Sequence, residues 1–212
     1  MAAAGRFITF EGGEGCGKST QIRLLADRLR AAGKEVSLTR EPGGTVLAER
    51  IRSLVREESD DSPNSRAETL LFLAARAQVV ENVIRPALAS GAWVLCDRFA
   101  DSTFAYQGYG RGLCLAELKR LNAFATGDLI PDRTILLNVS PEVAAERMRM
   151  REAATNTAAD RMEKAGDGFH ARLRQGFLDL AAAEPDRFSV IQADGGVAEV
   201  EEAVWSSIQP ML

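Results

Sequence analysis

The chain has 212 residues, of which 46% are hydrophobic and 26% charged, and its formal net charge is -4. This profile is typical of a single globular domain with a substantial core, and it excludes disordered and collagen-like chains. The longest apolar stretches, such as residues 70–75, are far shorter than the roughly 20 residues of a membrane-spanning helix. No membrane partner is therefore expected. The acidic balance also argues against a broad nucleic-acid-binding surface.

The first six residues lead directly into an apolar strand pattern, without the basic region and longer apolar core of a signal peptide. This start indicates a cytoplasmic protein. Three cysteines and the single histidine, His170, do not have the spacing of zinc ligands. We expect the cysteines to be reduced.

Short β-rich runs alternate with helical patterns. The expected strands are residues 6–10, 35–40, 93–98, 133–139 and 188–193. Most are nearly continuous apolar segments, as in strands covered on both faces. After the first strand, apolar residues recur with helical spacing from Ile22 to Leu29, and Gly33 follows as a stop signal. The order strand, helix, strand predicts an α/β fold with a five-stranded parallel sheet flanked by helices.

The second half of the chain contains a clear helix start at Ser140-Pro141-Glu142, where a capping hydroxyl precedes a proline and an acid. Two polar stretches, residues 56–66 and 152–160, interrupt the pattern. We expect the first to be a solvated surface loop. The second lies between arginine-bearing segments and is a candidate mobile lid. No interdomain linker is recognisable, so residues 1–212 are expected to form one domain.

Residues 12–19 read Gly-Gly-Glu-Gly-Cys-Gly-Lys-Ser and match the P-loop pattern G-x-x-x-x-G-K-[ST] between an expected strand and an expected helix. Glycines allow consecutive backbone N–H groups to face phosphate oxygens. Lys18 is expected to reach the β and γ phosphates, and the Ser19 hydroxyl to bind magnesium. A glycine-rich turn with an incidental lysine is the alternative. The expected nucleotide-binding residues are Gly12, Gly13, Glu14, Gly15, Cys16, Gly17, Lys18, Ser19 and Thr20.

An acid and a base end the third expected strand, at Asp97 and Arg98. Open α/β sheets bind ligands at this carboxyl edge. Asp97 suits a magnesium ion, held directly or through water, and Arg98 offers a planar fork to a phosphate. A simple ion pair at the strand end is the alternative.

The run from Asp97 to Gly108, Asp-Arg-Phe-Ala-Asp-Ser-Thr-Phe-Ala-Tyr-Gln-Gly, resembles the signature of thymidylate kinases. Further matches are the P-loop with its Glu14, Arg-Glu-Pro-Gly-Gly-Thr at 40–45, residues 71–76 and residues 160–163. The resemblance implies a P-loop nucleoside monophosphate kinase fold with a mobile lid. It also implies a homodimer that uses ATP and Mg²⁺ to phosphorylate dTMP to dTDP in dTTP biosynthesis.

The resemblance also implies the acceptor site. Phe72 and Arg76 lie four positions apart on one expected helix face, so the ring can stack on thymine while the guanidinium donates to it. Core packing is the alternative for Phe72. The remaining implied roles place Ser102, Thr103 and Gln107 at the base, Tyr106 under the sugar, Glu14 near the 3′-hydroxyl, Arg98 and Arg52 at the acceptor side, and Glu41 beside the reacting phosphate and metal.

The P-loop interior contains no arginine, whereas Arg147, Arg149 and Arg151 alternate at the start of the expected lid, residues 147–163. This pattern resembles the bacterial subclass with a lid arginine. A continuous helix would place Arg147 and Arg151 on one face and Arg149 elsewhere; for Arg147, a solvated face is the alternative. Arg151 is the leading catalytic candidate beside Lys18 and Arg98, and Arg161 is the runner-up.

Two features depart from the family pattern, namely Cys16 in place of the usual alanine and a long lid without glycine at residues 152–160.

Two rival functions also use a P-loop. A deoxynucleoside kinase would phosphorylate a 5′-hydroxyl and need a carboxylate base, and a nucleotide-gated switch would need no acceptor. The segment at residues 40–45 and the acceptor signature argue against the first. The sequence also lacks the Asn-Lys-x-Asp motif usual in GTPase switches.

Overall fold

The computed structural model describes residues 5–57, 61–155 and 166–212. Its strands are β1 (Phe7–Glu11), β2 (Val36–Arg40), β3 (Trp93–Asp97), β4 (Arg133–Asn138) and β5 (Phe188–Gln192). Its α-helices are α1 (Lys18–Ala31), α2 (Val46–Arg56), α3 (Ser65–Val79), α4 (Arg85–Ala89), α5 (Ala100–Thr103), α6 (Leu115–Thr126), α7 (Pro141–Thr155), α8 (Asp167–Ala183) and α9 (Val197–Ile208). Single π-helical segments follow α3 and α5, at Val80–Ile84 and Phe104–Gly110.

The five strands form one parallel sheet in the order β2-β3-β1-β4-β5. Each expected strand is present, with its ends shifted by no more than one residue, so the predicted fold class is confirmed. Phe10 of β1 lies opposite Asp97 of β3. This register brings the P-loop, which leaves β1, next to the acidic end of β3.

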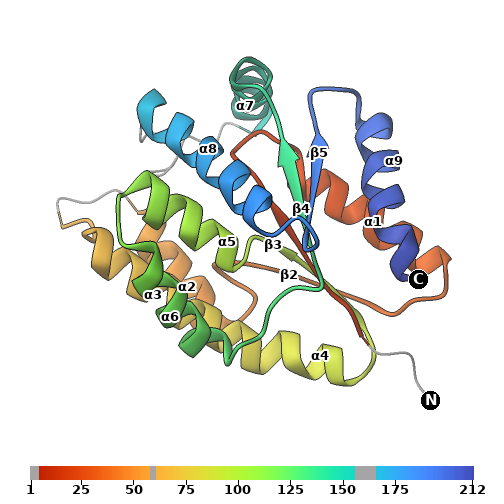
Figure 1. Ribbon diagram of the computed structural model, residues 1–212, viewed down its shortest axis with the longest axis horizontal. Helices are drawn as coiled ribbons and strands as arrows, with labels where there is room; N and C mark the ends of the chain where they lie inside the picture. The colour runs from red at the N-terminus through yellow and green to blue at the C-terminus, as the bar shows by residue number, and fades with distance from the viewer. Residues whose placement is uncertain (1–4, 58–60, 156–165) are drawn as a thin grey trace.

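Side chains of the inner strands alternate between two cores. On β1, Ile8 and Phe10 pack in the core that contains α1 and α9, whereas Phe7 packs with Val79 and Ile84 on the opposite face. Figure 1 shows α1 and α9 on one side of the sheet and α3, α4 and α8 on the other. The edge strands β2 and β5 are only partly covered, because each has a single neighbour.

The expected helix starts and stops are confirmed. The four residues that recur from Ile22 to Leu29 are all buried, and α1 ends two residues before Gly33. α7 begins at Pro141, and the Ser140 hydroxyl accepts a 3.5 Å hydrogen bond from the backbone N–H of Val143. α2 ends at Arg56, where the first polar stretch begins.

The second polar stretch is partly helical, because α7 continues through Thr155. The remainder of the expected lid, with Arg161, falls within residues 156–165 and so lies outside the described residues. In the part of the chain that the structure describes, no helix combines the length and apolar character needed to cross a membrane.

Candidate active site

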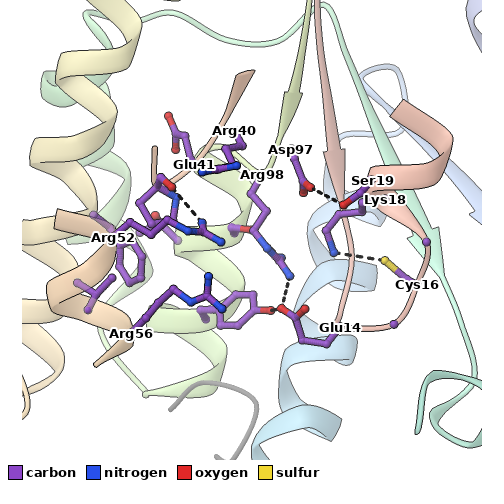
Figure 2. Close-up of a pocket in the computed structure, with 18 of the residues that line it drawn as sticks. Glu14, Cys16, Lys18, Ser19, Arg40, Glu41, Arg52, Arg56, Asp97 and Arg98 are labelled. Carbon is purple, nitrogen blue, oxygen red and sulfur yellow. Dashed lines mark hydrogen bonds and ion pairs between the residues drawn. The ribbon is translucent and has the colours of Figure 1, made fainter. Parts of the chain in front are cut away.

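A cavity of about 520 Å³ opens at the carboxyl ends of β1, β2 and β3. The predicted site residues that line it come from several separate segments of the chain: Glu14, Gly15, Cys16, Gly17, Lys18, Ser19, Thr20, Glu41, Arg52, Phe72, Arg76, Asp97, Arg98, Ser102, Thr103, Tyr106, Gln107 and Arg151. Gly12 and Gly13 contribute backbone carbonyls beneath the Lys18 side chain instead. Figure 2 shows the Arg98 side chain reaching Glu14, and the Arg52 and Arg56 side chains pointing into the same cavity.

The P-loop requires glycine where its backbone turns into the left-handed region. Gly15 has a φ of +71°, and a Cβ there would lie 2.6 Å from the carbonyl oxygen of Ala144 on α7. Lys18 Nζ curls back over the loop and donates to the carbonyl oxygens of Gly12 and Gly13, at 3.1 and 2.9 Å. The loop therefore presents an ammonium group and the N-terminus of α1 to the cavity, which is the arrangement that binds phosphates.

Cys16 is accommodated without disturbing this loop. Its side chain is 2% exposed and packs in the core beneath the P-loop. The Sγ atom lies 3.4 Å from Lys18 Nζ, which donates a hydrogen bond to it. A cysteine at position 16, where the family usually has alanine, is therefore compatible with the loop geometry.

The oxygen groups expected to bind magnesium lie together. Ser19 Oγ donates to Asp97 Oδ2 at 3.4 Å, a contact drawn in Figure 2. Glu41 lines the same cavity, and its Oε1 atom is buried without a hydrogen-bond partner among the described residues. Hard oxygen donors of this kind suit Mg²⁺, which keeps several waters and binds phosphate oxygens. The residues present therefore fit the expected ion.

Arg98 occupies the centre of the cavity in a strained backbone conformation, with a φ of +70°. Its guanidinium donates to Gly12 O at 2.9 Å, Ser102 Oγ at 3.2 Å and Glu14 Oε1 at 2.6 Å. Burial would raise the pKa of Glu14, but the charges of Arg98, Lys18 and Arg151 outweigh it and lower that pKa to about 2. Arg98 is thus part of a built site rather than a solvated strand-end ion pair.

Glu11 is absent from the predicted site, yet it organises the loop after Arg98. Its buried carboxylate accepts hydrogen bonds from the backbone N–H groups of Phe99 and Ser102, and from Ser102 Oγ at 2.6 Å. Burial and the nearby Asp101 raise the pKa of Glu11 to about 7. An acid at the end of an otherwise apolar strand, directly before the P-loop, was the available sequence signal.

Arg76 is buried, and four of its five N–H groups are engaged. Nε donates to Glu41 Oε2 at 2.7 Å, and Nη2 donates to Phe99 O at 3.0 Å. Nη1 donates to Thr103 Oγ1 and to Asn122 Oδ1. Burial raises the pKa of Glu41 to about 7, although the charge and hydrogen bond of Arg76 oppose that shift. The guanidinium is held rigidly at the cavity wall, and the described residues leave one of its N–H groups unengaged.

Phe72 lies one helical turn before Arg76 on α3, and both side chains line the cavity, as the spacing predicted. Phe72 is half-buried and also packs against the apolar cluster between α2 and α3. Its ring therefore has both a packing contact and an open face. The packing alternative does not exclude contact with a base.

Tyr106 forms the floor of the cavity beside Arg98. Its ring is 8% exposed and packs edge-on against Phe169 and Phe177. The Arg98 guanidinium lies 5.0 Å from the ring centroid, and the Tyr106 hydroxyl is 3.4 Å from Glu14 Oε1. The ring is thereby fixed by packing below and by charge above.

Three arginines at the cavity were missing from the predicted site, namely Arg40, Arg56 and Arg147. Arg40 and Arg56 line it together with Arg52, which donates to Pro42 O at 3.1 Å. Burial and the charges of Arg56 and Arg40 lower the pKa of Arg52. The spacing of four residues between Arg52 and Arg56 on α2 was the signal that could have revealed the second. The cluster creates a positive region suited to an anionic acceptor.

The arginines of α7 separate as the helical geometry predicted. Arg147 and Arg151 both line the cavity, whereas Arg149 is not among the described residues that line it. Arg147 donates to Ala193 O at 2.8 Å and Gly195 O at 3.0 Å, so it anchors the loop after β5. The alternative interpretation, in which Arg147 lies on a freely solvated helix face, is therefore wrong. Arg151 is exposed, and its charge acts on Glu14.

A P-loop, an arginine-rich acceptor pocket and a parallel sheet of order β2-β3-β1-β4-β5 define a P-loop nucleoside monophosphate kinase. The sequence profile described as thymidylate kinase matches residues 10–204. The chain belongs to the thymidylate kinase family.

Known proteins support this assignment along nearly the whole chain. The thymidylate kinase of Deinococcus radiodurans is 49% identical over 204 residues, covering 96% of each chain. That of a Synechococcus species is 50% identical over 206 residues, covering 97% of this chain and 95% of its own. The crystal structure of thymidylate kinase from Ehrlichia chaffeensis superposes with a TM-score of 0.78 at 34% identity, covering 97% of this chain and 100% of that one.

Proposed function

We infer that this protein transfers the γ-phosphoryl group of ATP to the phosphate of dTMP and so produces dTDP for nucleotide biosynthesis. One observation carries this conclusion beyond family membership. The phosphate-binding Lys18 and the acceptor-side Arg98 converge on a single cavity, whose opposite wall carries Phe72 and Arg76. A donor phosphate chain and an aromatic base can thus be bound together.

The chain's own residues account for transfer by positioning and charge. Lys18 and the P-loop amides bind the donor phosphates, and Arg98 orients the acceptor phosphate. Ser19 and Asp97 would hold Mg²⁺, which supplies charge neutralisation at the phosphates. Arg151 approaches from α7 to stabilise charge on the migrating group. No general base is required, because the acceptor phosphate is already anionic.

The acceptor nucleoside is positioned by the remaining cavity walls. Phe72 stacks on the base and Arg76 donates to it, while Ser102, Thr103 and Gln107 complete the base contacts. Tyr106 fills the space beneath the sugar, and Glu14 lies where a 3′-hydroxyl would be. Arg52 and Glu41 complete the acceptor side and the surroundings of the reacting phosphate.

We also propose that the chain forms one kinase domain and a homodimer. Its α6 surface exposes large apolar side chains, with Phe124 90% and Leu121 41% exposed. Leu70, on the adjoining α3, is 58% exposed. Burying such residues against a second copy removes apolar area from water. The free thiols of all three cysteines are consistent with a cytoplasmic location.

The direct test measures ADP release with ATP and Mg²⁺ plus dTMP, thymidine or no acceptor. We expect dTMP to stimulate ADP release strongly, and thymidine not to do so. Dominant stimulation by thymidine would instead indicate a nucleoside kinase, and ADP release independent of acceptor would indicate a switch. Lys18→Ala should abolish the dTMP-dependent rate. Lys34→Ala, a lysine that donates to Leu212 O instead, is the matched control.

A further inference from the structure

Behind the cavity wall lies a buried hydrogen bond between two polar side chains. Gln107 lines the cavity and is 2% exposed, whereas Glu68 on α3 is 0% exposed and is not among the residues that line it. Gln107 Nε2 donates to Glu68 Oε1 at 2.9 Å. Arg111 Nη2 forms an ion pair with Glu68 Oε2 at 3.3 Å. A completely buried carboxylate is costly unless it is paired in this way.

This contact determines which end of the Gln107 amide is available to a ligand. An amide can present either its carbonyl oxygen or its NH₂ group, and a rotation of 180° exchanges the two. Glu68 is ion-paired with Arg111 and accepts from the Gln107 amide, so the nitrogen of Gln107 faces Glu68. The Gln107 backbone oxygen accepts from the Leu113 N–H, whereas no described residue donates to the side-chain oxygen, Oε1. That oxygen is the acceptor left for a molecule in the cavity.

The resulting polarity matches one class of base. Thymine presents an N3–H donor between two carbonyl oxygens, whereas cytosine presents an N3 acceptor beside an NH₂ donor. The cavity offers the Gln107 oxygen as acceptor and the Arg76 guanidinium as donor. A site whose buried groups hydrogen-bond the correct ligand rejects an analogue with the opposite pattern strongly, because those groups are then left unpaired.

We propose that Glu68 is a positioning residue for base selection. By holding the Gln107 nitrogen, it keeps the amide oxygen turned toward the base and so favours nucleotides with an N3–H over cytosine nucleotides. This role rests on the proposed function, since it takes dTMP as the acceptor. Arg111 supports it by balancing the charge of Glu68.

The test compares kcat/KM for dTMP and dCMP in the wild type and in Glu68→Gln. A glutamine at position 68 has a similar shape but can donate as well as accept, so it permits the flipped amide of Gln107. We expect the dTMP-to-dCMP ratio to fall about tenfold or more. The change should lie mainly in KM, with dUMP affected as dTMP is. Glu81→Gln, which changes a 66% exposed acid, is the matched control and should keep the ratio.

A double-mutant cycle separates positioning from a general structural effect. If Glu68 acts through the amide, Glu68→Gln should change the ratio no further in a Gln107→Leu background. The idea is overturned if folded Glu68→Gln keeps the wild-type ratio, or if it lowers the ratio equally in both backgrounds. Thermal melting by circular dichroism establishes folding. Should the wild type itself show no preference for dTMP, the proposed function fails instead.

Discussion

The buried Glu41 carboxyl should make the stability of this protein depend on pH. Glu41 is 5% exposed, and its pKa is raised from 4.5 to about 7, chiefly by burial. The folded state therefore binds a proton between these pH values that the unfolded chain has lost. This contribution to stability is fully present below pH 4.5 and is lost as the pH rises through 7.

Glu41→Gln removes this titration while retaining an oxygen that can accept from Arg76 Nε. Raising the pKa from 4.5 to about 7 corresponds to about 3 kcal/mol, at roughly 1.36 kcal/mol for each tenfold change in proton affinity. The stability of the variant relative to the wild type should therefore increase by about 3 kcal/mol between pH 4.5 and 8. Glu11 is unchanged in both proteins, so its own titration cancels to first order in the comparison.

The assay is urea unfolding of both proteins without nucleotides at several pH values, and circular dichroism monitors the unfolding. Glu49→Gln is the matched control, because the partly exposed Glu49 carboxylate has its pKa lowered, chiefly by hydrogen bonds from Gly44 N–H and Arg40 that outweigh burial. The free energy of unfolding of that control should change with pH as that of the wild type does, from pH 6 to 8. Parallel curves for Glu41→Gln over the whole range would refute the reasoning, as would a difference of opposite sign.

Three further predictions concern catalysis, selectivity and assembly. Arg151→Ala should lower kcat by roughly 10²-fold, about 2.7 kcal/mol, with little change in dTMP affinity. Steady-state kinetics can decide this, with Arg149→Ala as the control. If Arg151→Ala keeps a near-normal kcat while Arg161→Ala loses most of it, the catalytic role belongs to Arg161 instead. Tyr106→Ala should raise activity on the ribonucleotide relative to dTMP, because a cavity opens beside the sugar; an unchanged ratio in the folded variant would leave Tyr106 a packing residue. Light scattering at micromolar concentration should give twice the chain mass of 22.9 kDa for the wild type and a single chain mass for Phe124→Glu. A wild-type monomer would contradict the proposed dimer.

The sequence alone determined the fold class and the parts of the site whose chemistry is local. A P-loop consists of consecutive residues between a strand and a helix, so its pattern and its context are both recognisable in the order of the residues. The five strands could be located for a similar reason, since buried parallel strands form short apolar runs. The resemblance singled out Phe72 and Arg76, and the period of one helix placed them on the same face.

Only the tertiary structure decided the contacts between distant segments. The pairing of Glu41 with Arg76, the hold of Glu11 on Ser102 and the contact of Glu68 with Gln107 each join residues at least 35 positions apart. Buried polar groups must find partners, but a sequence does not state which partner lies within about 3 Å. That choice depends on the packing of the helices against the sheet. It converts a set of recognisable acids and arginines into a cavity with defined charges and acceptors.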